Sequence, residues 1–304
     1  MNYFDIKQNG MKEFLQNRKP RNGPPGKHIW SIILIALAIS LLGDLIAGIP
    51  TLYLCRYVDD PGWRFLLENY LVFIGSFGLM ILYLWSYDRE LFNTILPAKA
   101  GGLKGNTLKQ LALGFVAGMA LNGLCALIAA LHGDLKFSIG RFDILYMAVA
   151  LILVAIQSSC EELILRGYIF QAIDRKFGLI QAIVWNSIVF ALLHMGNNGI
   201  GPLPIIDLLV WSVACSLVLY YFDSLWFIMM AHTAWNYTQN FLLGLPNSGL
   251  VSERSFLHLE AASDSIFYDF SFGLEGGIIS TLEFVIISAA IILCARKRKP
   301  NIIE

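Results

Sequence analysis

Apolar stretches of membrane-spanning length recur along most of the chain. A bilayer core about 30 Å thick requires about 20 mostly apolar residues in one helix. Hydrophobic residues make up 57% of the chain and charged residues 14%, against about 45–50% and about 25% in soluble domains. The sequence therefore predicts an all-α polytopic membrane bundle of about eight transmembrane helices. The predicted helices are 29–55, 65–87, 108–131, 142–172, 179–195, 205–222, 225–243 and 275–295.

The predicted helices divide the chain into four parts. Residues 1–28 are a basic polar tail that is too long for the first region of a cleavable signal peptide. Residues 29–141 hold the first three helices, and residues 142–243 hold four more, which carry the polar patterns described below. Residues 244–304 hold an acidic loop, the last helix and a basic tail.

The distribution of lysine and arginine predicts the orientation of the bundle. Sixteen of these 22 residues lie in the two tails and in the connections after the second and fourth helices, counting Lys109 at the edge of the third helix. Five lie in the connections on the opposite side, and Arg166 lies within a helix. Cytoplasmic segments carry the excess of such charges, so both termini are expected in the cytoplasm. The basic tails and the composition suggest a bacterial plasma membrane.

Short polar patterns interrupt three of these apolar helices. Ionisable groups are costly in hydrocarbon, so in membrane segments they usually face the bundle interior or water and mark a functional site. The three patterns are Glu161-Glu162-x-x-x-Arg166, Phe190-x-x-x-His194 and His232-x-x-x-Asn236.

The first pattern combines an acid pair with an arginine. Glu162 and Arg166 are four residues apart, so they share one helix face and can form an ion pair. A buried arginine needs such a partner. Glu161 lies about 100° further round the helix, which leaves it free to act as a general base on another group. A structural clamp is the alternative interpretation of a lone glutamate–arginine pair.

The second and third patterns each place two side chains on one helix face. Phe190 can pack as a spacer that limits water, and His194 is either a catalyst or a packed core histidine. His232 and Asn236 offer two N–H donors, which is what a developing oxyanion requires. A polar clasp between helices is the structural alternative for this pair.

The expected depths of these groups in the membrane do not coincide. Counted from the cytoplasmic helix ends at about 1.5 Å per residue, Glu161 lies about 16 Å deep, His194 about 24 Å and His232 about 10 Å. Helix tilt, or a different end of the fifth helix, must close this gap if the three residues form one site.

Other kinds of site find no support in the sequence. There is no H-E-x-x-H zinc motif, and Gly43-Asp44 lacks the earlier glycine of a G-x-G-D aspartyl motif. The five cysteines are dispersed without a C-x-x-C spacing, which indicates neither a disulfide framework nor a cysteine metal site. Cys160 could act as a thiol nucleophile, but neighbouring residues such as Cys160 and Glu161 do not face each other on a helix.

The ordered set of three patterns resembles the CPBP family, the CAAX prenyl endopeptidase and bacteriocin-processing group that is also called Abi. The resemblance covers roughly residues 145–243, and no motif position is substituted. It implies an eight-helix fold and a glutamate-dependent intramembrane endopeptidase. Glu161 and His194 would then activate a water molecule, while His232 and Asn236 would stabilise the tetrahedral intermediate. The supporting positions are Glu162, Arg166 and Phe190.

This resemblance also sets the expected cofactors and partners. No cofactor is expected, although Glu161, His194 and His232 would form a two-histidine-one-carboxylate set for a divalent metal such as zinc. The expected partners are membrane lipids and a substrate that is a lipidated, leader or signalling peptide or a membrane protein. No nucleic-acid partner is expected, because the membrane topology already accounts for the basic tails.

Two other functions are alternatives to the protease. One is a non-catalytic bacteriocin-immunity or regulatory membrane protein that uses the same fold as a binding scaffold. The polar patterns would then serve as a structural clasp. The other is a transporter, which would require inverted repeats or matching discontinuous helices in two halves. We find no internal repeat in the sequence.

Overall fold

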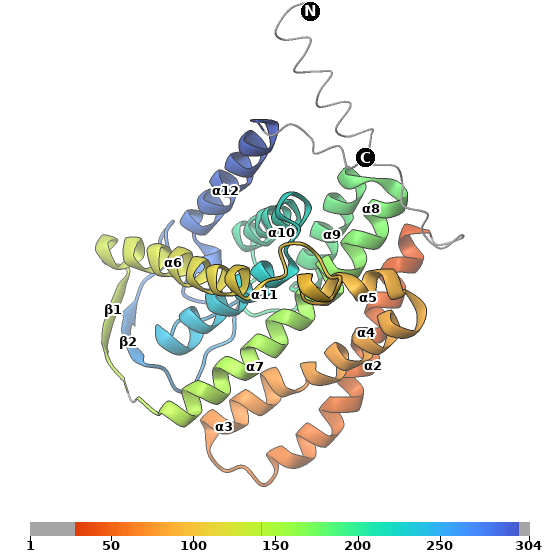
Figure 1. The fold of residues 1–304 in the computed structure, drawn as a ribbon. Coiled ribbons are helices and arrows are strands. Elements are labelled where there is room, and N and C mark those ends of the chain that lie inside the picture. Colours follow the sequence, from red (N-terminus) through yellow and green to blue (C-terminus); the bar gives the residue numbers. More distant parts are fainter. Residues whose placement is uncertain (1–27, 141, 298–304) are drawn as a thin grey trace, which may run out of the picture.

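The computed structural model describes residues 28–140 and 142–297, and it describes side chains as far as residue 294. The predicted basic tail therefore lies outside the described residues except for His28, as does the end of the C-terminal tail. The described part of the chain forms one bundle of helices, with a small two-stranded sheet at one side (Figure 1).

The eight predicted helices all overlap helices of the structure, which confirms the helical class. The main helices are α2 (Ile29–Cys55), α4 (Phe73–Tyr87), α6 (Leu108–His132), α7 (Ile144–Glu162), α9 (Leu179–Leu193), α10 (Pro202–Phe222), α11 (Leu225–Tyr237) and α12 (Ile278–Lys297). The short helices are α3 (Pro61–Leu66), α5 (Arg89–Ile95), α8 (Gln171–Phe177) and the 3-10 turns η2 (Ala98–Ala100) and η5 (Leu274–Gly276).

Three π-helical segments continue the main helices with a wider turn. They are η1 (Leu67–Leu71) between α3 and α4, η3 (Leu163–Phe170) between α7 and α8, and η4 (Thr238–Leu242) after α11. Such segments are rare and occur frequently at functional sites. Residues of η1 and η3 line the central cavity described below.

Several helix ends differ from the predicted ones. The second predicted helix begins at Pro61 instead of residue 65, because Asp60 caps its N-terminus and proline fits the first turn. The sixth predicted helix begins at Pro202 instead of residue 205, because proline fits the first turn of a helix. The fourth continues through η3 and α8 to Phe177, and the last begins at Ile278.

Five described helices are long and apolar enough to cross a membrane, which makes the chain a multi-pass integral membrane protein. They are Ile29–Cys55, Pro61–Tyr87, Leu108–His132, Ile144–Phe177 and Pro202–Phe222. The shorter apolar helices are Leu179–Leu193 and Ile278–Cys294. The number of eight membrane spans and the cytoplasmic position of both termini stay predictions.

A small antiparallel sheet was not predicted. Strand β1 (Leu135–Ile139) follows α6, and strand β2 (Leu257–Ala262) lies in the long loop before α12. Leu135 pairs with Ala262 and Ile139 with Leu257. This pairing fastens the long loop to the connection between α6 and α7.

Helix α11 packs closely against α6 and α7 near the centre of the bundle (Figure 1). Glycines on α6 permit the close approach, because a Cβ atom on Gly114 or Gly118 would overlap the carbonyl oxygen of Phe227 or Ala231. Small residues allow helix backbones to approach closely in this way within membranes. The contact places the polar face of α11, which begins next to Ala231, inside the bundle.

Candidate active site

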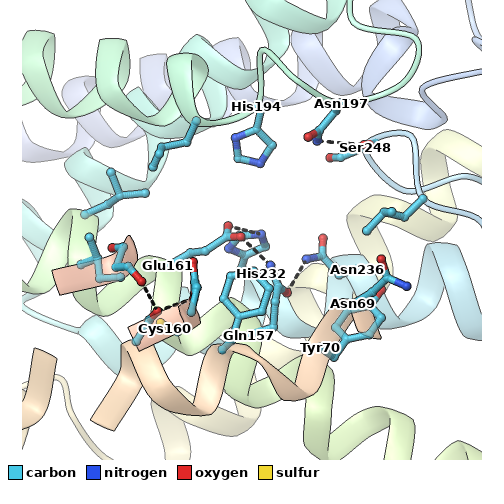
Figure 2. A pocket seen from close by; sticks show the side chains of 18 of the residues that line it. Asn69, Tyr70, Gln157, Cys160, Glu161, His194, Asn197, His232, Asn236 and Ser248 are labelled. Atoms are coloured by element: carbon cyan, nitrogen blue, oxygen red, sulfur yellow. Dashed lines mark hydrogen bonds and ion pairs between the residues drawn. The ribbon is translucent and has the colours of Figure 1, made fainter. Parts of the chain in front are cut away.

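A cavity of about 300 Å³ lies inside the bundle. All four residues predicted to be catalytic line it: Glu161, His194, His232 and Asn236. They come from α7, from the C-terminal end of α9 and from α11. Figure 2 shows Glu161 beside His232, with His194 across the cavity. The fold therefore closes the difference in depth that the sequence alone left between these residues.

Glu162 and Arg166 form the ion pair that their spacing predicts. Nη1 of Arg166 lies 3.0 Å from Oε1 of Glu162, and both side chains are fully buried. The guanidinium carbon of Arg166 lies 4.8 Å from the centre of the Phe190 ring. Phe190 therefore covers the arginine of the first pattern by a cation–π contact, in addition to packing 4.6 Å from the ring of His194.

Glu161 does not take part in that ion pair. One oxygen, Oε1, accepts a hydrogen bond from Nε2 of Gln157 at 2.6 Å. The other oxygen, Oε2, is buried and has no hydrogen-bond partner among the described residues. It lies 3.9 Å from Nε2 of His232. A buried carboxylate oxygen usually has a donor, so the free oxygen is available to a molecule in the cavity.

His232 is oriented by the second acid of the first pattern. Its Nδ1 atom lies 2.8 Å from Oε1 of Glu162. The carboxylate can only accept, so Nδ1 carries the proton of this hydrogen bond. The opposite ring atom, Nε2, therefore points towards Glu161. The spacing of the first pattern predicts a pair between Glu162 and Arg166. The contact of Glu162 with His232 was not predicted.

His194 is oriented by the backbone of its own helix. Its Nδ1 atom lies 2.8 Å from the carbonyl oxygen of Phe190. A carbonyl oxygen accepts only, so the proton sits on Nδ1 and Nε2 keeps its lone pair. His194 can therefore accept a hydrogen bond inside the cavity. It lines the same cavity as Glu161, but no hydrogen bond between the two is found among the described residues.

Asn236 lies one helical turn after His232, as predicted. Its Nδ2 atom lies 3.4 Å from Oε1 of Gln157 and 3.3 Å from Oγ of Ser158. Its Oδ1 atom accepts a hydrogen bond from Nδ2 of Asn247 at 3.2 Å. The long contacts on the Nδ2 side leave its N–H groups weakly held beside the cavity.

Sequence reasoning missed several polar residues of the cavity. Gln157 lies one turn before Glu161, and a helical wheel through the first pattern could have revealed it. Asn247 and Ser248 come from the long loop, and no local signal in the sequence marks them. Asp44 also lines the cavity, although its helix was given no role in the site.

Asp44 is the only charged residue within α2. An ionisable residue in a membrane helix suggests function by default, and this signal could have identified it. A Cβ atom on Gly43 would overlap the backbone of Ser76, so α2 and α4 touch at this point. Ser76 hydrogen-bonds to Asp44 across the contact. Asp44 and Glu161 line the same cavity from two different helices.

The residues of the alternative metal set were tested for their grouping. Glu161, His194 and His232 line one cavity. However, no three histidine, cysteine or acidic side chains within 28–140 and 142–297 are grouped closely enough to hold a metal ion. We therefore derive no chemical step through a metal, and a reaction without a metal stays a prediction.

Several helices are apolar and long enough to span a membrane, and the cavity inside the bundle is lined by acids, histidines and amides. The protein is therefore an integral membrane protein with an internal polar site. Residues 142–238 match the family model described as type II CAAX prenyl endopeptidase Rce1-like. This part of the chain is therefore similar to CAAX-type proteases, which confirms the resemblance drawn from the three patterns. A comparison with curated proteins gave no match, and a comparison with solved structures gave none.

Proposed function

We propose that the chain is an intramembrane endopeptidase that hydrolyses a peptide bond with a water molecule activated by Glu161 and His194. The observation that carries the proposal is the free, buried Oε2 atom of Glu161 in a cavity that two histidines also line. The family match over residues 142–238 supports the same class of enzyme.

Glu161 serves as the general base in this proposal. The water gives one proton to Oε2 of Glu161 while its oxygen forms a bond to the peptide carbonyl carbon. Nε2 of His194, which keeps its lone pair, accepts a hydrogen bond from the same water. When the C–N bond then breaks, the leaving amine takes up the proton from Glu161. The carboxylate is thereby regenerated for the next cycle.

His232 and Asn236 stabilise the oxyanion of the tetrahedral intermediate in this proposal. Asn236 has N–H groups beside the cavity for this purpose. His232 can donate from Nε2 only when both of its ring nitrogens carry protons, because Nδ1 already donates to Glu162. A doubly protonated ring would then lie between the carboxylates of Glu161 and Glu162.

The proposed substrate is a short segment of a peptide or membrane protein. A cavity of about 300 Å³ is at the lower end of the range of small-ligand pockets, about 300–1,000 Å³. It can therefore take a few side chains around one peptide bond and no folded domain. We propose a leader or signalling peptide, lipidated or not, or a membrane-protein segment that enters from the bilayer.

The test is a cleavage assay in nanodiscs with a quenched peptide library. Glu161→Gln keeps the size of the side chain and removes the base. We expect it to lower kcat by about 10²–10⁴-fold, the usual contribution of general-base catalysis. The matched control is Glu260→Gln, because Glu260 is exposed on β2 and lies away from the cavity. Full activity of Glu161→Gln would overturn the proposal.

A non-catalytic binding scaffold is the second function considered. In that case the three patterns would form a structural clasp, and each buried polar atom of the clasp should have a partner. Glu162 and Arg166 also have buried atoms without a partner among the described residues, but of these three residues only Glu161 lines the cavity, and its unpartnered Oε2 atom favours the protease. Under the scaffold alternative, partner binding would survive Glu161→Gln and His194→Asn.

A further inference from the structure

Glu275 is a buried acid outside the segment that matches the family. It lies in the turn η5 before α12, and 5% of its surface is exposed. Three N–H donors converge on its carboxylate. Oε1 accepts from Trp235 at 3.0 Å and from Asn247 at 2.8 Å, and Oε2 accepts from Gln239 at 2.6 Å.

All three neighbours of this carboxylate are donors. An ionised carboxylate only accepts, whereas a protonated one must donate through one oxygen. The surrounding donors therefore match the ionised form. Burial raises the pKa of Glu275, and the hydrogen bonds from Gln239 and Trp235 oppose that rise. Glu275 thus fixes the direction of every hydrogen bond that it receives.

Asn247 links Glu275 to Asn236 beside the cavity by hydrogen bonds. Its Nδ2 group donates to Oε1 of Glu275 and to Oδ1 of Asn236 at 3.2 Å. A carboxamide nitrogen has two protons, so these contacts use both. Since Oδ1 of Asn236 is held on the Asn247 side, its Nδ2 group must face Gln157, which lines the cavity, and the buried Ser158. Figure 2 shows the side chain of Asn236 near that of Gln157.

We propose that Glu275 is a positioning residue for the protease: through Asn247 it holds the Asn236 carboxamide with its N–H groups turned to the reacting carbonyl. The inference rests on the proposed function, because it requires Asn236 to donate to the oxyanion. It extends the catalytic apparatus to the long loop and to the turn η5 before α12.

A second set of contacts keeps Asn247 in place. Nε2 of Gln239 also donates to the carbonyl oxygen of Pro246 at 2.6 Å, and its Oε1 atom accepts from Asn122 on α6 at 2.6 Å. The next loop residue, Ser248, accepts at its carbonyl oxygen from Asn197 at 2.9 Å. The loop is therefore anchored on η4 and on the segment that follows His194.

The first variant for the test is Glu275→Gln. The new amide has the same shape, but its NH₂ group would meet a donor where an oxygen now accepts. The carboxamides of Asn247 and Asn236 can then turn over. We expect kcat to fall by about 10–100-fold, less than the loss of about 10²–10³ for removal of an oxyanion donor. KM should change by no more than about twofold, because the substrate contacts remain.

A double-mutant cycle separates positioning from a general loss of structure. In the Asn236→Ala background, Glu275→Gln should cause no further loss of kcat, because its effect passes through Asn236. Asn247→Ala breaks the link while sparing the bonds of Glu275 to Trp235 and Gln239, and it should lower kcat in the same way. This second variant keeps the test valid if Glu275→Gln fails to fold.

The matched control is Glu283→Gln on α12. No hydrogen bond joins Glu283 to Asn236 among the described residues, so kcat should stay close to that of the wild type. The inference would be overturned if the losses of kcat caused by Glu275→Gln and Asn236→Ala multiplied in the double variant. It would also be overturned if Glu275→Gln and Asn247→Ala both folded and kept the kcat of the wild type. Neither result would affect the proposed function. Full activity of Glu161→Gln would instead overturn the proposed function on which it rests.

Discussion

Nδ1 of His232 lies 2.8 Å from Oε1 of Glu162. The same carboxylate oxygen also accepts from Nη1 of Arg166 at 3.0 Å. One oxygen therefore joins α7, η3 and α11 in a buried network. Because Nδ1 is held in this way, Glu162 sets the orientation of the His232 ring in the cavity. Glu162 itself does not line the cavity.

This relationship predicts different effects on stability for substitutions of the two neighbouring acids. Glu162→Gln leaves the buried Arg166 without its charged partner, and breaking a buried ion pair costs about 3–5 kcal/mol of stability. It also releases the ring of His232, so activity should fall as well. Glu161→Gln, in contrast, should leave stability nearly unchanged, because Oε2 of Glu161 has no partner to lose.

The measurement is thermal unfolding of both variants in one detergent, beside the wild type. Glu260→Gln on the exposed strand β2 serves as the control for the loss of a surface charge. A Glu162→Gln protein as stable as the wild type would show that Arg166 does not depend on this pair. An equal loss of stability in both variants would contradict the division of roles between the two acids.

Removal of metal ions should not affect the enzyme. Glu161 and the two histidines line one cavity but are not grouped as metal ligands among the described residues. We therefore expect the cleavage rate to stay within about twofold after treatment with a chelator, far from the loss of at least 10²-fold that removal of a catalytic group causes. Loss of activity with a chelator, followed by recovery on addition of zinc, would favour the metal-dependent alternative.

Local patterns explain why much of the fold and part of the site could be predicted. Each membrane helix needs its own apolar stretch, so the helices were visible in the sequence one by one. The Glu162–Arg166 pair follows from a spacing of four residues on one helix. For the same reason His194 was correctly placed on the face of Phe190, where the two rings are in contact.

Contacts between distant segments could not be predicted in this way. Asn247 donates to Asn236 from a loop, and Glu275 reaches Asn247 from the turn before α12. Both contacts depend on how the long loop folds back over α11, which no periodic pattern records. Asp44 was set aside because Gly43-Asp44 does not match an aspartyl motif, while the fold brings it to the cavity of Glu161 on α7.

Asp44 should influence the choice of substrate. Its carboxylate lines the cavity, and no lysine or arginine is among the described lining residues. A positively charged group near the scissile bond could therefore bind Asp44. A hydrogen bond to a charged group contributes about 1.5–3 kcal/mol. Asp44→Asn should then raise KM about 10- to 100-fold for peptides with lysine or arginine near the scissile bond.

The measurement compares matched peptides that carry arginine or its neutral analogue citrulline at one position. Asp44→Asn should leave the neutral peptide nearly unaffected, because the cavity keeps its shape and its catalytic groups. An equal loss for both peptides would mean that the bond between Asp44 and Ser76 serves only to join α2 to α4.

The close packing of α6 against α11 should control the position of His232. A Cβ atom on Gly118 would overlap the carbonyl oxygen of Ala231, the residue that precedes His232. Gly118→Ala must therefore push the two helices apart, and such overpacking costs about 1–3 kcal/mol. We expect lower stability and a lower kcat, since His232 moves relative to Glu161.

Gly123 on the same helix provides the matched control. A Cβ atom at this position would meet nothing within 4 Å. Gly123→Ala should therefore keep wild-type activity and leave stability equal or slightly higher, because glycine is a poor helix former. Thermal unfolding and the kcat of both variants test the prediction. If Gly118→Ala lost stability but kept its kcat, the α6–α11 contact would support the fold without fixing the geometry of His232.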